Sequence, residues 1–144
     1  IKPGLGDENA NQVSLQKLQK KAQILSLHIP QSPETIGMID KNFIDNMSNP
    51  FWFLNSARGK AVITEDLVDG IEKGKILGAG LDVLEYESSS FESIFNQSNR
   101  PKALDYLLSS DCVLLSPHVG GWTRESHVKL AQTILDKIVD LTTR

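Results

Sequence analysis

Several features that mark particular classes of protein are scarce in this sequence. It has 144 residues and one cysteine, Cys112, so an intrachain disulfide is excluded and a reducing, cytoplasmic compartment is expected. Lys and Arg number 15 against 18 Asp and Glu, and the resulting net charge of −3 indicates no nucleic-acid partner. The longest apolar runs, such as Phe51–Leu54, are far shorter than the about 20 residues of a membrane-spanning helix. A globular protein that binds neither nucleic acid nor membrane is therefore indicated.

Four short apolar runs recur along the chain and predict β-strands. Turn-forming residues bound each run, and each run is too short for a buried helix. Three of the runs are almost continuously apolar, which is typical of strands covered on both faces of a parallel sheet. The four predicted strands are Ala22–Ile29, Pro50–Ser56, Ile76–Val83 and Cys112–Pro117.

The segments between the strands carry helical patterns. Ser14 and Thr64 are suitable N-cap residues for the helices that would follow them. The predicted helices are Leu15–Lys21, Thr35–Met47, Glu65–Lys73, Ala103–Leu108 and Thr123–Leu141. Strands and helices alternate at a spacing of roughly 30 residues, which is the sequence form of linked βαβ units. An α/β fold with a doubly wound parallel sheet is predicted, and the polar stretch Glu87–Asp111 is predicted to be a surface excursion.

Polar and glycine residues follow the predicted strands at their carboxyl ends. Open parallel sheets bind ligands at that edge, so these residues are the candidates for a functional site. They are His28, Arg58, Asp82, Glu85, Glu87, His118, Gly120 and Gly121.

These residue types suit one class of reaction. Arg58 can hold a carboxylate with its two-pronged guanidinium, and His118 can exchange a proton with a carbonyl or hydroxyl oxygen near neutral pH. A carboxylate beside His118 would fix its tautomer and favour its charged form. Gly120-Gly121 would let a ligand approach the backbone closely. The three histidines are too scattered to predict a metal site; they are His28, His118 and His127.

Each side chain also has a structural alternative. Arg58 can form a surface ion pair, Glu87 can be solvated in its polar loop, and His118 can pack in a turn. Cys112 is expected in the buried core. Gly78-Ala79-Gly80 imitates part of a dinucleotide-binding motif, but it lies inside a predicted strand and lacks a third glycine, so it is not assigned that role.

Four segments together resemble the motifs of the D-isomer-specific 2-hydroxyacid dehydrogenases. They stand in the family's order with similar spacing, and the resemblance covers nearly the whole chain. The double glycine after His118 is similar to D-3-phosphoglycerate dehydrogenases in particular. The four segments are Leu25–Pro30 with Pro33–Thr35, Leu54–Gly59, Gly78–Glu87 and Leu115–Gly121.

The resemblance implies a role for several positions. Arg58 would bind the substrate carboxylate and its C2 oxygen, His118 would be the acid/base, and Glu87 would be its carboxylate partner. Asp82 would accept a hydrogen bond from the nicotinamide carboxamide of NAD. The residues expected to line the cofactor are His28, Ile29, Ser56, Ala57, Arg58, Asp82, His118, Gly120 and Gly121.

The sequence also departs from the family pattern. It contains no glycine-rich phosphate loop, no acidic residue to bind the adenine ribose and no separate substrate domain. Residues 1–144 are therefore expected to be the C-terminal part of a Rossmann-like NAD-binding domain in a longer enzyme. Ser88 follows Glu87 where the family usually has proline, and Trp122 follows the glycines where a smaller residue is common.

The resemblance implies an oxidoreductase that transfers a hydride between NAD(H) and a D-2-hydroxyacid/2-oxoacid pair. A homodimer is implied, and 3-phosphoglycerate is a candidate substrate, which would place the enzyme in serine biosynthesis. Two alternatives stay open. One is a dinucleotide-sensing, corepressor-like binding protein of the same fold, and the other is a fragment that is inactive on its own.

Overall fold

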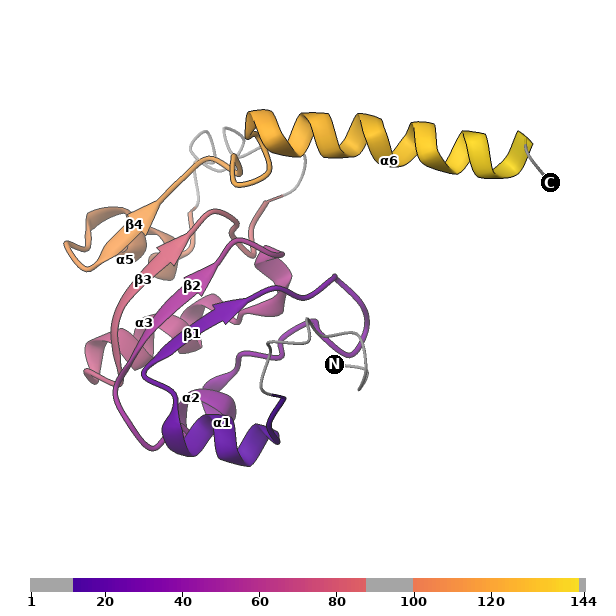
Figure 1. Cartoon of the computed structure of the whole chain (residues 1–144). Helices are drawn as coiled ribbons and strands as arrows, with labels where there is room; N and C mark the ends of the chain where they lie inside the picture. Colours follow the sequence, from indigo (N-terminus) through magenta and orange to yellow (C-terminus); the bar gives the residue numbers. More distant parts are fainter. Residues whose placement is uncertain (1–11, 88–99, 143–144) are drawn as a thin grey trace.

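A four-stranded parallel sheet forms the centre of the molecule (Figure 1). The computed structural model describes residues 12–87 and 100–142. The strands lie side by side in chain order, and every neighbouring pair is parallel. They are β1 (Ile24–Leu27), β2 (Phe51–Asn55), β3 (Ile76–Leu81) and β4 (Val113–Leu115). The predicted α/β class and its parallel, Rossmann-like sheet are confirmed, and each strand lies within its predicted apolar run.

Helices precede, connect and follow the strands. They are α1 (Leu15–Lys21), α2 (Lys41–Asp45), α3 (Thr64–Glu72), α5 (Lys102–Ser109) and α6 (Arg124–Thr142), with a short 3-10 helix, η1, at Gly59–Ala61. The Ser14 side chain accepts a hydrogen bond from the Lys17 amide at 3.3 Å, so the predicted cap of α1 is confirmed.

Two details of the helix prediction were wrong. The helix predicted over Thr35–Met47 is limited to α2, because Gly37 adopts a φ of +63° and Ile39 pairs with Val62 in an isolated β-bridge. Asp40 caps α2 by accepting a hydrogen bond from the Phe43 amide at 2.8 Å. Thr64 is the first residue of α3 rather than its N-cap, and that position belongs to Ile63.

One face of the sheet carries the core. Phe51 and Phe53 of β2 are fully buried on this face, with Leu25 of β1 and Leu81 of β3 buried beside them. Helix α3 packs on β3 and on α5, and α5 in turn packs on β4. The alternation of buried and exposed residues along β1 and β2 follows from the two-residue period of a strand.

The opposite surface, which we call the bare face, was expected to be covered as well. Its apolar side chains remain exposed, from 44% for Leu54 to 75% for Leu114, so that expectation is wrong for the described residues. The strand registers align these residues across the sheet. The bare face comprises Ile24, Trp52, Leu54 and Leu114, with Gly78 and Gly80 between them.

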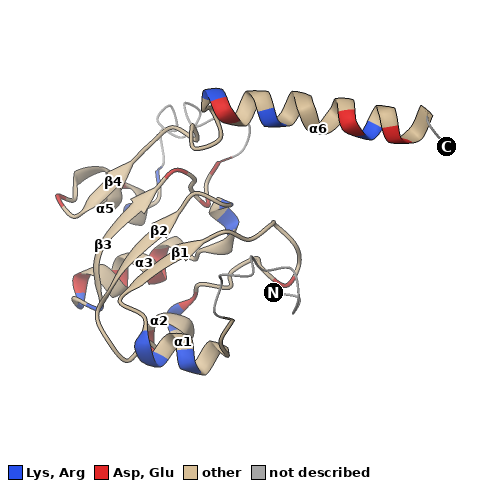
Figure 2. Ribbon diagram, in the orientation of Figure 1, with Lys and Arg blue, Asp and Glu red and all other residues tan. Residues whose placement is uncertain are grey.

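Helix α6 projects from the body of the molecule with its charged residues spread along it (Figures 1 and 2). The predicted helix is confirmed, but it buries none of its residues. Cys112, expected in the core, is exposed beside β4, because it lies in the turn before that strand rather than within it. Within the described ranges, no helix is long and apolar enough to cross a membrane.

Candidate active site

The loop after β2 carries Arg58, and a buried asparagine shapes it. Asn55, the last residue of β2, is only 2% exposed. Its Oδ1 accepts a hydrogen bond from the Ala57 amide at 3.0 Å, and its Nδ2 donates to the Arg58 carbonyl at 3.1 Å. A buried side-chain amide must satisfy its donor and acceptor, and here it does so by folding residues 56–58 against the strand end. In the sequence, the only signal for Asn55 is a polar residue that ends an apolar run, and this residue was not predicted to belong to the site.

The Arg58 side chain is exposed at this edge of the sheet. Its Nη1 donates to the Ala57 carbonyl at 2.6 Å, and it forms no ion pair with any residue that the structure describes. Within residues 12–87 and 100–142, the surface ion pair that was the structural alternative for Arg58 is therefore not found. A guanidinium without a carboxylate partner leaves most of its donors available to an anionic ligand.

A glycine brings the Arg58 loop against the segment that follows β3. A Cβ atom at Gly59 would overlap the carbonyl group of Leu84, so a larger residue could not pack at this distance. The close approach places the Arg58 backbone next to the residues that lead to Glu85 and Glu87. No separate role was predicted for Gly59, because a contact across 25 positions leaves no local signal in the sequence.

Asp82 holds the loop that follows β4. Its Oδ1 accepts hydrogen bonds from the Ser116 hydroxyl at 2.6 Å and the Val119 amide at 2.9 Å, and its Oδ2 accepts one from the Gly120 amide at 2.8 Å. Burial raises the pKa of this carboxyl, but the three hydrogen bonds outweigh it and hold the pKa below its usual range. Asp82 is therefore ionised at neutral pH. Ser116, for which no role was predicted from the sequence, is part of this anchor.

His118 lies in that loop and meets Glu87. Its Nδ1 is 3.1 Å from the Oε2 of Glu87, which comes from the segment after β3. The backbone of His118 has a φ of +56°, a left-handed conformation that is uncommon for residues other than glycine and often marks a functional position. Because Nδ1 is occupied by the carboxylate, Nε2 is the ring nitrogen left to exchange a proton with a ligand. The His118 side chain is 49% exposed, so a ligand can reach the ring.

Glu85 and Glu87 face different neighbours although they are two residues apart. The Oε2 of Glu85 accepts hydrogen bonds from the amide and the hydroxyl of Thr64, both at 2.8 Å, at the start of α3. The Glu87 side chain is 17% exposed and contacts His118 instead, so its solvated alternative does not describe the structure. The structure thus brings Glu87, and not Glu85, to the histidine.

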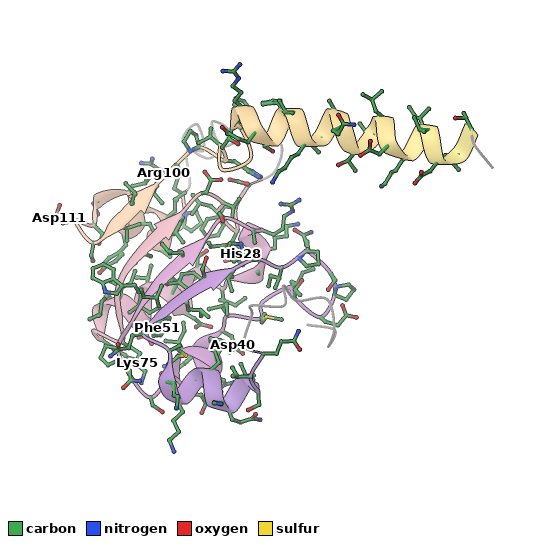
Figure 3. All side chains as sticks on the ribbon, viewed as in Figure 1. His28, Asp40, Phe51, Lys75, Arg100 and Asp111 are labelled. Carbon is green, nitrogen blue, oxygen red and sulfur yellow. The ribbon has the colours of Figure 1, made fainter. Side chains whose placement is uncertain are left out.

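The residues expected to line NAD differ in how far they are exposed. His28 is exposed at the end of β1, where its Nε2 lies 2.8 Å from the Ser26 hydroxyl (Figure 3). Ile29 is half-buried, Ala57 is buried and Ser56 is exposed. The Cβ of Ser56 lies 3.8 Å from where a Cβ on Gly120 would be. Ser56 and Gly120 therefore lie close together although they follow different strands.

The donors and acceptors at this edge fit the nicotinamide end of a dinucleotide. The ionised Asp82 carboxylate has more lone pairs than its three hydrogen bonds use, so it can accept a further donor such as a carboxamide N–H. A Cβ at Gly121 would meet no atom within 4 Å, which leaves open space beside that backbone. Among the residues that the structure describes, no group of His, Cys, Asp and Glu side chains could hold a metal ion.

Known proteins are similar to this chain in sequence and in fold. Residues 3–120 match the family model of the D-isomer specific 2-hydroxyacid dehydrogenase, NAD binding domain. An aromatic 2-oxoacid reductase of Clostridium sporogenes is 34% identical over 123 residues, which are 85% of this chain and 37% of that protein. A hydroxypyruvate reductase of Blautia hydrogenotrophica is 30% identical over 136 residues, 94% of this chain and 38% of that protein.

Solved structures show the same likeness. The NAD-complexed D-isomer specific 2-hydroxyacid dehydrogenase of Lactobacillus delbrueckii ssp. bulgaricus superposes with a TM-score of 0.73 and 29% identity, covering 91% of this chain and 40% of that one. The D-lactate dehydrogenase of Aquifex aeolicus, complexed with NAD and lactic acid, gives a TM-score of 0.72 and 28% identity with the same coverage. This chain spans less than half the length of each of these relatives.

A parallel α/β sheet with glycines and charged side chains gathered at its carboxyl edge is the arrangement of a nucleotide-binding domain. The match over residues 3–120 is more specific than that. The chain belongs to the D-isomer specific 2-hydroxyacid dehydrogenases, and it matches their NAD binding domain. The family predicted from the four sequence motifs is therefore confirmed, and with it NAD as the cofactor of the domain.

Proposed function

We propose that this chain is the C-terminal part of the NAD-binding domain of an enzyme that interconverts a D-2-hydroxyacid and its 2-oxoacid. The observation that carries the proposal is the contact of His118 Nδ1 with Glu87 Oε2 at 3.1 Å, at the same sheet edge as the exposed Arg58. A positioned histidine–carboxylate pair and a guanidinium are what proton transfer at an oxygen next to a carboxylate requires.

In this proposal, three side chains act on the substrate or on each other. Arg58 binds the substrate carboxylate and C2 oxygen through its paired donors, which a lysine could not imitate. His118 donates a proton from Nε2 to the C2 oxygen during reduction and accepts it back during oxidation. Glu87 holds the Nδ1 side of the ring and stabilises the imidazolium.

NAD, when bound, supplies the hydride acceptor or donor for this chemistry. The residues of this chain that would hold it are Asp82, as acceptor for the carboxamide, and the backbone around Ser56 and Gly120-Gly121. The ionised state of Asp82 and the open space at Gly121 support this assignment. His28 and Ile29, at the end of β1, are proposed to line the cofactor through their main chain.

The relatives narrow the substrate that we propose. Their names refer to aromatic 2-oxoacids, hydroxypyruvate, lactate and glyoxylate. None of the named relatives is a phosphoglycerate dehydrogenase, so 3-phosphoglycerate rests on the double glycine after His118 alone. We therefore propose a small 2-oxoacid without a phosphate group.

The test is NADH oxidation by the full-length protein with a panel of 2-oxoacids. Pyruvate, hydroxypyruvate and phenylpyruvate are expected to be reduced to D-products, and 3-phosphohydroxypyruvate is expected to be reduced far more slowly. The His118→Gln variant should bind NADH but lose turnover. Tight NADH binding by the wild-type protein without turnover of any 2-oxoacid would instead favour the corepressor-like alternative.

We also propose that the full-length protein is a homodimer, as the family resemblance implies. The apolar side chains of the bare face need a covering partner, which is either the rest of the full-length protein or a second copy, because contiguous exposed apolar surface is a common mark of an interface. Light scattering of the full-length protein measures the oligomeric state directly. A mass equal to one chain at micromolar concentration would contradict the proposal.

A further inference from the structure

A tight turn after β3 carries Glu87. The Glu87 amide donates to the Leu84 carbonyl at 3.2 Å, which closes a four-residue turn over 84–87. Leu84 is buried, so the turn begins from a fixed point in the core. Glu85 and Tyr86 are its two central residues, and Glu87 is its last. The direction of the Glu87 side chain therefore depends on how the two central residues are held.

Glu85 attaches the turn to the start of α3. The first amides of a helix have no partner within the helix, and the N-cap residue of α3, Ile63, has no side-chain oxygen to offer them. Glu85 supplies the missing acceptor, since its Oε2 binds both the amide and the hydroxyl of Thr64 at 2.8 Å. Thr64 is only 3% exposed, so this contact is largely shielded from water. A carboxylate at a helix N-terminus is also favoured by the helix dipole.

Tyr86 makes a second attachment to the same helix. Its hydroxyl donates to the Oε1 of Glu65 at 3.0 Å. Burial and the neighbouring carboxylates raise the pKa of Tyr86 to about 12, so the hydroxyl keeps its proton and remains a donor. Both central residues of the turn are thus tied to the first turn of α3.

Glu87 itself has little else to orient it. Its Oε2 contacts His118, but its Oε1 is buried and has no hydrogen-bond partner among the residues that the structure describes. The contact with His118 is thus the one hydrogen bond that the described residues give to this carboxylate. The backbone of the turn must therefore set where the carboxylate lies relative to His118.

We propose that Glu85 is a positioning residue for the reaction. By fixing the turn to the N-terminus of α3, it places the Glu87 carboxylate at the Nδ1 of His118. The inference rests on the proposed function, because it concerns how the proposed acid/base is held. The carboxylates that act on His118 are Glu87, in contact with it, and Asp82, which anchors its loop.

The test compares three variants of the full-length protein. Glu85→Ala removes both hydrogen bonds and is expected to lower kcat for 2-oxoacid reduction about tenfold, because a small displacement of a reacting group is costly. The KM for NADH should stay unchanged. Glu85→Gln should restore most of the rate, since its amide oxygen can accept the same two hydrogen bonds. Asp40→Ala is the matched control, because Asp40 caps α2 away from the proposed site.

A structural role alone would give a different result. Glu85→Ala and Asp40→Ala should both lower Tm, but only Glu85→Ala should move the alkaline limb of the reduction profile to lower pH. A lower Tm in both variants, with kcat and the pH profile unchanged, would overturn the proposal. If Glu85→Ala does not fold, Thr64→Val removes one of the two hydrogen bonds and should give a smaller change in the same direction, and Thr64→Ser should restore it. Unchanged kinetics in Thr64→Val would likewise overturn the proposal.

A second measurement separates this inference from the proposed function. The imidazole signal of His118 can be followed by NMR against pH without substrate or cofactor. In Glu85→Ala it should titrate at lower pH than in the wild type, because the carboxylate no longer lies beside the ring. If this shift occurs but the wild type reduces no 2-oxoacid, the positioning is correct and the proposed reaction is wrong. If the titration is the same in both proteins, Glu85 does not position Glu87.

Discussion

The carboxyl edge of the sheet and its bare face are built from the same four strands, yet they hold their side chains in opposite ways. At the edge, Asn55, Asp82 and Glu87 each make hydrogen bonds that fix a loop or a ring. On the bare face, Trp52 and Leu114 are more than half exposed. The topology of a parallel sheet concentrates loop backbone and polar groups at the edge, whereas its faces offer only side chains. We expect edge residues to govern the reaction, and bare-face residues to govern association.

The largest difference between the two regions should come from Arg58→Lys. Lysine keeps the charge but cannot make the paired contact to a carboxylate and a carbonyl oxygen. We expect kcat/KM for the 2-oxoacid to fall. The fall should correspond to a loss of roughly 2–4 kcal/mol of transition-state stabilisation. Steady-state kinetics of the full-length protein measure it, with Trp52→Phe on the bare face as the comparison. Near-normal kinetics in Arg58→Lys would remove this residue from the site.

The second-largest effect should be a loss of stability in Asp82→Asn, because Asp82 anchors the His118 loop. Asp82→Asn keeps one acceptor but turns an N–H group toward the Gly120 amide, which already donates there. We expect the free energy of unfolding at pH 7 to fall by about 1–3 kcal/mol, the usual cost of an unsatisfied buried group. Urea unfolding measures this loss.

The pH dependence of the same variant gives an independent check. Because the folded-state pKa of Asp82 lies below its usual value, its charge stabilises the wild type above the unfolded-state pKa near 4. That contribution is lost as the pH falls through the lower folded-state pKa. The wild type should therefore lose stability more steeply than Asp82→Asn below about pH 4. Parallel curves over this range would show that Asp82 carries no such stabilisation.

These anchors also show where sequence reasoning succeeds and where it stops. The four strands and the gathering of polar residues at one edge of the sheet were predictable, because apolar runs and a parallel topology fix which residues follow which strand. The choice of Glu87 as the partner of His118 came from the family resemblance, since the topology alone left both Glu85 and Glu87 open. Asn55 and Ser116 were not predicted, since their roles depend on hydrogen bonds that the chain makes only once folded. A local pattern carries no trace of a partner that lies 34 positions away, as Asp82 does from Ser116.

Capping shows the same limit on a smaller scale. Thr64 has the right side chain for an N-cap, but Ile63 occupies that position in the structure. Glu85 makes this possible by supplying an acceptor from 21 residues further along the chain. The prediction that both faces of the sheet are covered was wrong for a related reason. An apolar run indicates that a strand has low polarity on both sides, and it says nothing about which segment covers each side.

A smaller effect should follow from Glu87→Gln, which keeps the shape of the side chain but removes its charge. Without the carboxylate the imidazolium of His118 is less stable, so the protonated form survives only to lower pH. Reduction needs the protonated ring, so the alkaline limb of its profile should move toward acid. Oxidation needs the neutral ring, so its acid limb should move in the same direction.

Glu85→Gln is the control for this pH experiment. Its amide oxygen still accepts from Thr64, and it does not contact His118, so both limbs should stay in place. A shift in Glu85→Gln without one in Glu87→Gln would mean that the wrong carboxylate has been assigned. Absence of a shift in both variants would mean that His118 exchanges its proton without help from a carboxylate.

The smallest effect on stability should come from a substitution on the bare face. It also tests most directly whether the two faces of the sheet differ. Leu81 and Leu114 lie on adjacent strands but on opposite faces, 4% and 75% exposed. In the 144-residue chain, Leu81→Ala should cost about 2–5 kcal/mol because it leaves a cavity in the core. Leu114→Ala should change the unfolding free energy by less than about 0.5 kcal/mol and should reduce self-association in sedimentation velocity. If both substitutions cost the same, the bare face is covered in solution, and its contrast with the other face does not hold.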